Sequence, residues 1–289
     1  MGGGSYSSVR YAATMDMKGY ADKSGEQIFT QRSLSGAMSP QGVVLREARD
    51  SEEHPNSFPI ILALDVTGSM GAIPTYLVKE GLPALMDKII SAGVKDPQLL
   101  FMGIGDHECD RAPLQIGQFE SSDQLLDKWL TELWIESGGG GNAGESYLLA
   151  WFFASRFTAT DQFDKRKKKG LLITIGDEPT LQQIPKVCQQ RIMGDGQFSD
   201  VSAADLLDKA REKYEVYHLH MLQGQNGNNQ RVKDGWVQLM GPNVIFVQRR
   251  EDVAQIVADL VVKSAADNPA VISSEQLVEG TGIKIQDML

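Results

Sequence analysis

Three apolar runs of the sequence each end in residues whose side chains carry oxygen atoms. Asp65, Thr67 and Ser69 follow the first run at positions i, i+2 and i+4, where a tight turn can point three short side chains at one centre. Asp177 follows the third run, and an acidic group at 106–110 follows the second. Carboxylate, hydroxyl and carbonyl oxygens are the ligands that Mg²⁺ and Mn²⁺ prefer. These residue types therefore indicate a site for a hard divalent cation.

The runs themselves have the composition of strands buried on both faces, and amphipathic stretches separate them. Pro83 predicts a kink in the first amphipathic helix. The alternation predicts an α/β fold: a doubly wound, mostly parallel, Rossmann-like sheet with one antiparallel edge strand and helices on both faces. Ligands bind beyond the carboxyl ends of the strands in such sheets. We expect strands at 58–65, 98–106, 113–119, 170–177, 215–222 and 243–248, and helices at 73–90, 121–134, 144–157, 201–213 and 251–265.

The composition and the hydrophobic pattern of the sequence change at two points, which suggests a three-part organisation. Residues 1–57 are rich in Gly, Ser and charged residues and carry no sustained hydrophobic period, so we expect an N-terminal arm and a loosely structured lead-in. Residues 58–265 carry the alternating pattern of the domain. Residues 266–289 have only weak signals and are expected to form a C-terminal tail.

The composition is that of a folded, acidic chain. Hydrophobic residues make up 42% of the 289 residues and charged residues 23%, which is enough apolar material for a sizeable core. The 28 Lys and Arg residues against 38 Asp and Glu residues give a formal net charge of −10. Such a chain has no overall positive field to attract nucleic acid or anionic lipid, so neither is expected as a partner.

Several features favour a cytoplasmic location. Cys109 and Cys188 are the only cysteines, far too few for a disulfide framework, which indicates a reducing compartment. The first twenty residues lack the charged segment and apolar run of a secretory signal. The sequence has no stretch of 18 apolar residues, so no membrane span is expected.

The motif at the first strand end carries a resemblance to a known family. The segment ALDVTGSMG resembles the metal-ion-dependent adhesion site (MIDAS) of von Willebrand factor A (VWA) domains. The segments FMGIGDHECD, GGGGNAGES and LLITIGDEPT follow in an order similar to the VWA variant of alpha-kinase-associated proteins. The resemblance covers about residues 58–264.

The resemblance implies a set of metal ligands. Thr67 and Ser69 would coordinate Mg²⁺ or Mn²⁺ directly, and Asp65 and Asp177 would act directly or through water. Many family members have a threonine in the glycine-rich loop, whereas this chain has Gly141 before Asn142. Asn142 can offer a neutral oxygen in its place, and the spacing GGGGNAGE is similar to a variant with Asp at that position.

The resemblance also implies a function in binding rather than in catalysis. In the family, a carboxylate from another protein completes the coordination shell of the ion, and no catalytic base is needed. Intracellular bacterial members often work beside AAA-type ATPases of the MoxR group. The implied partner is therefore another protein, such as a MoxR-type ATPase or another component of an assembly.

An enzymatic function is the alternative hypothesis. The segment DVTGS also looks like the DKTGT of P-type ATPases and of phosphotransferases in the haloacid dehalogenase superfamily, in which the aspartate is phosphorylated. Asp65 would then be the nucleophile and Asp177 a Mg²⁺ ligand. Against this hypothesis, Thr67 stands where soluble phosphatases place a second, acid–base aspartate, and the glycine-rich loop would have no role.

Other residues have structural interpretations beside functional ones. Asp65 and Asp177 could each cap a following helix. The group at 106–110 could bind a second cation, contact a partner or form a solvated turn. His218 and His220 face the same side of a predicted strand, where hydrogen-bonded polar positions are favoured over zinc ligands. The glycines before Glu145 do not form a phosphate-binding loop, because a P-loop requires lysine at that point.

Overall fold

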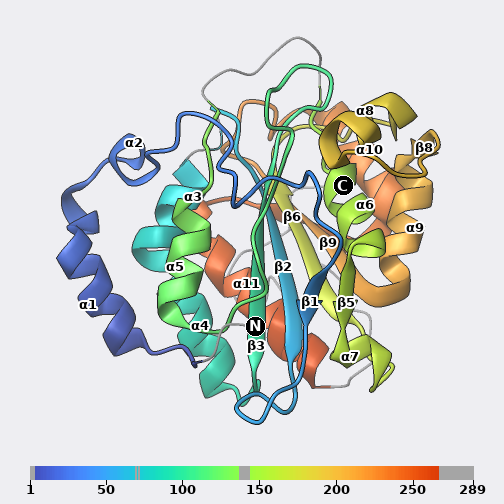
Figure 1. Cartoon of the computed structure of the whole chain (residues 1–289). Coiled ribbons are helices and arrows are strands. Elements are labelled where there is room, and N and C mark those ends of the chain that lie inside the picture. The colour runs from blue at the N-terminus through green and yellow to red at the C-terminus, as the bar shows by residue number, and fades with distance from the viewer. Residues whose placement is uncertain (1–3, 69, 71, 137–143, 267–289) are drawn as a thin grey trace.

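The centre of the molecule is a six-stranded sheet (Figure 1). The computed structural model describes the chain except for residues 1–3, 69, 71, 137–143 and 267–289. The strand order is β10-β9-β6-β2-β3-β4, and every neighbouring pair is parallel except β3 and β4. The predicted mostly parallel sheet with one antiparallel edge strand is thus confirmed. The strands are β2 (Phe58–Asp65), β3 (Pro97–Ile104), β4 (Leu114–Ile116), β6 (Gly170–Gly176), β9 (Tyr214–Met221) and β10 (Val244–Val247).

The central strand β2 is apolar along its length because the sheet is covered on both faces. Its alternate side chains enter two separate hydrophobic clusters: Ile60 and Leu62 lie in one, and Ile61 and Ala63 in the other. The strand pairs with β3 on one side and with β6 on the other. Its carboxyl end, Asp65, therefore lies in the middle of the sheet edge.

Helices cover both faces, as Figure 1 shows. One face carries α3 (Ala72–Tyr76), α4 (Leu82–Ser91), α5 (Asp123–Thr131) and α11 (Val253–Ala265). The other face carries α6 (Leu148–Arg156), α8 (Lys186–Met193), α9 (Ala203–Lys213) and α10 (Gln230–Met240). The doubly wound α/β fold is therefore as predicted.

The helix expected at 73–90 is interrupted just before Pro83, where a kink was expected from the proline. A π-helical turn, η2 (Leu77–Gly81), separates α3 from α4, and Pro83 lies in the first turn of α4. Proline has no N–H, and its ring clashes with the carbonyl four residues earlier, so a regular helix cannot continue through it. The wider turn before Pro83 accommodates this constraint.

The N-terminal segment is more ordered than its sequence indicated. Helix α1 (Ser8–Lys18) is capped by the Ser7 side chain and ends at Gly19, which has a left-handed φ of 64°. Its Tyr11 is fully buried and its hydroxyl donates to the Val78 carbonyl at 2.9 Å. The expectation of a loose lead-in is wrong for this helix. Because Tyr11 is its only buried residue, α1 has no visible hydrophobic period.

The rest of the N-terminal segment follows the edge of the fold. The Ile116 N–H of edge strand β4 donates to the Met38 carbonyl at 2.8 Å. Strand β1 (Arg46–Ala48) pairs in parallel with β5 (Thr158–Thr160). The domain boundaries at 57 and 265 stay predictions, and residues 267–289 of the expected tail lie outside the described residues. The remaining elements are η1 (Tyr20–Asp22), α2 (Gly25–Ile28), α7 (Asp161–Asp164), β7 (Gln183–Ile184), β8 (Val201–Ser202), η3 (Gly241–Asn243) and η4 (Arg250–Asp252).

No helix within the described part of the chain is long and apolar enough to cross a membrane.

Candidate metal centre

Two of the predicted metal ligands, Asp65 and Asp177, lie where the sheet changes its winding direction. Numbered along the chain, the six strands have the order 3-2-1-4-5-6, so β2 and β6 are the first and fourth strands and lie side by side. In doubly wound sheets the crevice for ligands opens at this point, beyond the carboxyl ends of the two strands. Asp65 ends β2, and Asp177 directly follows β6. The fold thus brings these two carboxylates together across 112 residues.

Asp65 organises the turn that follows β2. The side chain is 1% exposed, and its Oδ1 accepts hydrogen bonds from the Thr67 N–H at 2.9 Å and the Thr67 hydroxyl at 2.6 Å. Because the Thr67 hydroxyl gives its proton to Asp65, the lone pairs of its oxygen are left for a cation. Among the described residues, Asp65 accepts a backbone hydrogen bond only from Thr67, whereas α3 begins at Ala72, so the described contacts do not show a cap of α3.

Tyr147 completes the surroundings of Asp65, although no feature of the sequence pointed to it. Its buried hydroxyl donates to Asp65 Oδ2 at 2.8 Å. The ring lies edge-on to His218 and Trp236, with centroid distances of 5.2 and 5.4 Å. A Cβ at Gly176 would lie 1.8 Å from the Tyr147 hydroxyl, so a glycine at the end of β6 is required for this contact. Both oxygens of Asp65 are therefore held by protein donors.

Asp177 presents one bound and one free carboxylate oxygen. It is fully buried, and its Oδ2 accepts from the Asn226 N–H at 3.0 Å. Its Oδ1 is buried, and no described residue donates a hydrogen bond to it. The backbone at Gly224 passes so close that a Cβ there would lie 2.3 Å from the Asp177 carboxylate. The interpretation of Asp177 as a helix cap is not supported, because the next helix, α8, begins only at Lys186.

Glu145 is a second buried carboxylate with a free oxygen. The residue is 7% exposed, and its Oε2 has no hydrogen-bond partner in the described part of the chain. Burial, and next the charge of Asp65, raise the pKa of Glu145 to about 10. The sequence marked Glu145 only as the residue that rules out a P-loop. Its proximity to Asp65 depends on the fold and could not be read from the spacing.

These residues belong to an acidic region at the sheet edge. Burial raises the pKa of Asp65 to about 6, and it also raises the pKa values of Asp110, Asp177 and Glu178. None of the ion pairs between described residues neutralises any of these four carboxyls or Glu145. A bound cation would supply the missing positive charge.

Among the described residues, His, Cys, Asp and Glu side chains alone do not form a complete metal site. Within the described ranges, no three His, Cys, Asp or Glu residues are grouped closely enough to hold a metal ion. Of the five predicted ligands, Asp65, Thr67 and Asp177 lie at one crevice. Ser69 and Asn142 fall outside the described residues. A site here must therefore use hydroxyl, amide or water oxygens besides carboxylates.

The acidic loop after β3 is only partly a solvated turn. Asp106 and His107 are buried, whereas Glu108 and Cys109 are exposed. Asp110 Oδ2 accepts from the Asp106 N–H at 2.7 Å, and Asp106 Oδ1 accepts from the Glu108 N–H at 2.8 Å. These bonds within the loop give the carboxylates of Asp106 and Asp110 one donor each, and the second cation stays a prediction.

The two histidines of β9 are hydrogen-bonded core residues. His218 is stacked on Trp236 at a centroid distance of 3.6 Å, and its Nδ1 lies 2.9 Å from the Thr174 hydroxyl. His220 Nε2 lies 3.1 Å from the Gly227 carbonyl oxygen. Burial lowers the pKa of both rings, that of His220 to about 4, so both are neutral at pH 7. The expectation that both are hydrogen-bonded polar residues is thus confirmed for one ring nitrogen of each histidine.

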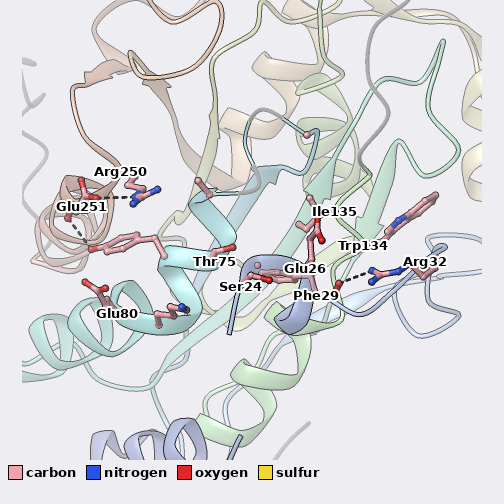
Figure 2. Close-up of a pocket in the computed structure, with 15 residues that line it drawn as sticks. Ser24, Glu26, Phe29, Arg32, Thr75, Glu80, Trp134, Ile135, Arg250 and Glu251 are labelled. Carbon is pink, nitrogen blue, oxygen red and sulfur yellow. Dashed lines mark hydrogen bonds and ion pairs between the residues drawn. The ribbon is translucent and has the colours of Figure 1, made fainter. Parts of the chain in front are cut away.

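An open cavity of about 1140 Å³ begins beside the turn that follows β2, at Gly68. The segment 24–32 forms one wall of it, and α3 and the loop before α11 form the others. Figure 2 shows Arg250 and Glu251 on one side of this cavity and Arg32 and Trp134 on the opposite side. The cavity is large enough for a segment of another molecule, and its lining contains charges of both signs.

Comparison with known proteins gives distant structural similarity only. No protein-family model matches the sequence, and no curated protein matches it significantly. The pilus adhesin SpaC from Lactobacillus rhamnosus GG, in its open conformation, is similar over 75% of this chain and 31% of its own, with 10% identity and a TM-score of 0.48. A von Willebrand factor type A structure from Catenulispora acidiphila is similar over 73% of this chain and 43% of its own, with 12% identity and a TM-score of 0.38. The chain spans less than half the length of either.

Proposed function

We propose that this chain is a protein-interaction module of VWA type that binds its partner through a divalent cation. The cation, Mg²⁺ or Mn²⁺, would lie at the crevice between the ends of β2 and β6. Thr67, Ser69 and Asn142 would supply neutral oxygens, and Asp65 and Asp177 would supply negative charge directly or through water. A carboxylate of another protein would complete the shell, with no chemistry performed on the partner.

One observation carries this proposal: Asp177 Oδ1 is buried with no partner among the described residues, at the same crevice where Asp65 accepts a hydrogen bond from the Thr67 hydroxyl. Burial of a carboxylate oxygen without a hydrogen bond is unfavourable, because the oxygen loses its hydrogen bonds to water and no protein donor replaces them. A cation would satisfy this oxygen. The residues present thus fit a hard metal ion.

The setting that we propose follows from the charge of the chain. A net charge of −10 repels an acidic partner, whereas a metal ion supplies positive charge at one point. The cavity beside Gly68 gives the partner's flanking residues a place to bind. We propose a multiprotein assembly in the cytoplasm, with a MoxR-type AAA ATPase as one candidate partner.

The phosphotransferase alternative has less support from the geometry. A nucleophilic aspartate needs a free oxygen that can reach a phosphoryl group. Asp65 is 1% exposed, and both of its oxygens accept hydrogen bonds from Thr67 or Tyr147. Release of a phosphate from an aryl phosphate in the presence of Mg²⁺, lost in Asp65→Asn, would favour the enzyme instead.

Thermal unfolding with and without Mg²⁺ tests the metal site. After chelation, Mg²⁺ at about 100 times its dissociation constant should stabilise the native wild type by roughly 2.7 kcal/mol. Asp65→Ala and Thr67→Val should both lose this shift, since the first removes the charge and the second replaces a ligand hydroxyl with a methyl group. The absence of a shift in wild type with either Mg²⁺ or Mn²⁺ would contradict the proposal.

A pull-down from a lysate of the source cells then tests the partner's chemistry. We expect a protein that wild type retains with Mg²⁺ and releases with a chelator, and that Thr67→Val does not retain. Neutralising one carboxylate of that partner should abolish its binding.

A further inference from the structure

A second, smaller pocket lies where the N-terminal segment meets the loop before β4 and the end of α8. Its volume is about 250 Å³, and it is lined by Leu34, residues 39–41 and 110–114, Arg191 and Ile192. Beside the pocket, the Gly42 N–H donates to the Met193 carbonyl at 3.1 Å, which holds the N-terminal segment against α8. A pocket of this size admits a small ion or a single functional group rather than a whole segment of another protein.

Two arginines line this pocket without a carboxylate partner in the described part of the chain. Neither Arg111 nor Arg191 forms an ion pair with a described residue. Arg191 is held in place, because its Nη2 donates to the His107 carbonyl. Burial lowers the pKa of His107, and the positive charge of Arg191 acts in the same direction. A guanidinium group has five N–H donors, so both arginines keep donors for a ligand.

The other polar side chains of the lining leave this positive charge uncancelled. Asp110 is the one carboxylate among the described residues of the lining, and it is engaged with its own loop. Its Oδ2 accepts from the Asp106 N–H at 2.7 Å, and a Cβ at Gly105 would lie 2.5 Å from the same oxygen. Ser39 Oγ accepts from the Gln41 N–H at 3.3 Å, which leaves its hydroxyl proton to donate. The lining thus has two positive charges against one negative charge, and an additional hydroxyl donor.

We propose that this pocket binds a phosphoryl group, held by Arg111 and Arg191. Two guanidinium groups match the two negative charges of a phosphate dianion, and each can donate two parallel hydrogen bonds to its oxygens. A carboxylate carries only one charge and would leave one arginine unpaired. The phosphoryl group could belong to free phosphate or to a phosphorylated side chain of a partner, since both present the same oxygens. The site is separate from the proposed metal centre, because neither Asp65 nor Asp177 lines it.

Isothermal titration calorimetry with inorganic phosphate tests this site in the full chain, with a chelator present and the ionic strength held constant. Arg111→Gln and Arg191→Gln each remove one guanidinium group. Arg231→Gln is the matched control, because Arg231 of α10 is also exposed and without an ion pair to a described residue, but does not line the pocket. Far-ultraviolet circular dichroism checks that all three variants are folded.

We expect wild type and Arg231→Gln to bind phosphate equally, and Arg111→Gln and Arg191→Gln to bind it at least about tenfold more weakly, because each loses charge-assisted hydrogen bonds. Acetate should bind wild type more weakly than phosphate does. Absence of phosphate binding in wild type, equal weakening in all three variants, or acetate binding as tight as that of phosphate would overturn the proposal.

A blocked phosphoserine, with both its amino and carboxyl groups capped as amides, distinguishes the two sources of the phosphoryl group. Tighter binding of this compound than of inorganic phosphate would support a phosphorylated side chain of a partner as the ligand. Weaker binding would support free phosphate. In either case its binding should be lost in Arg111→Gln and Arg191→Gln together with that of phosphate, and binding that survives both substitutions would contradict the assignment.

Discussion

At the scale of single residues, the carboxylates at the crevice differ in how many of their oxygen atoms accept hydrogen bonds. Asp65 has donors on both oxygens and orients Thr67, whereas Asp177 and Glu145 each have a buried oxygen to which no described residue donates. Hydrogen bonds to Asp65 oppose the rise of its pKa that burial causes. Glu145 has no such compensation from hydrogen bonds to its Oε2, and its pKa is raised further. Asp65 thus positions Thr67, whereas Asp177 and Glu145 each keep one oxygen atom that no described donor satisfies.

The raised pKa of Glu145 predicts a pH effect in the metal-free protein. Because its folded pKa of about 10 exceeds the ordinary value of 4.5, its contribution to stability is fully present below about pH 4.5 and is lost as the pH rises toward 10. Wild type should therefore become less stable relative to Glu145→Gln between pH 5 and 8, by at most roughly 1.4 kcal/mol per pH unit. Urea unfolding with a chelator present measures the difference, and a difference independent of pH would contradict it.

At the scale of elements, glycines set how closely the loops approach the crevice. The end of β6 can lie against Tyr147 only because Gly176 has no Cβ, and the chain near Gly224 can cross Asp177 for the same reason. Neither glycine has a left-handed φ. Their role is close packing rather than an unusual backbone.

Gly176→Ala should therefore displace Tyr147 and disturb Asp65. We expect a loss of about 1–3 kcal/mol in unfolding free energy from overpacking, and a weaker stabilisation by Mg²⁺. Gly235→Ala in α10 is the control, because a Cβ at this position would meet no atom within 4 Å beyond its own helix backbone. It should stabilise the protein by about 0.5–1 kcal/mol and leave the Mg²⁺ effect unchanged. A Mg²⁺ effect preserved in Gly176→Ala would refute this role of the contact.

At the scale of the whole molecule, the N-terminal segment is part of the fold. Ion pairs join Arg10 to Asp123 at 2.7 Å and Lys18 to Asp127 at 2.5 Å, and both aspartates are almost fully buried. The same segment supplies one wall of the cavity at Gly68. Removal of this segment would therefore change both the stability and the surface beside the proposed metal site.

Tyr11→Ala should release this segment. Loss of a fully buried aromatic side chain costs about 3–5 kcal/mol, and here the hydrogen bond to the Val78 carbonyl is lost as well. Met17→Ala changes a side chain of the same helix that is 82% exposed, and should alter stability by less than about 0.5 kcal/mol. Urea unfolding gives both values, and limited proteolysis should cut residues 8–28 first in Tyr11→Ala. Equal effects of the two substitutions would refute the role of Tyr11.

The sequence by itself determined the α/β class, the mostly parallel sheet and the edge at which the oxygen-bearing side chains of Asp65, Thr67 and Asp177 lie. The reason is that hydrophobic periodicity and strand-end residues are local properties, and parallel strands must end at one edge. Only the tertiary structure decided that Tyr147 donates a hydrogen bond to Asp65, that Glu145 is buried within reach of the charge of Asp65, and that α1 packs on the core. These contacts join residues far apart in the chain, so neither composition nor spacing encodes them. They depend on burial, on close packing at Gly176 and on the strand order that places β2 beside β6.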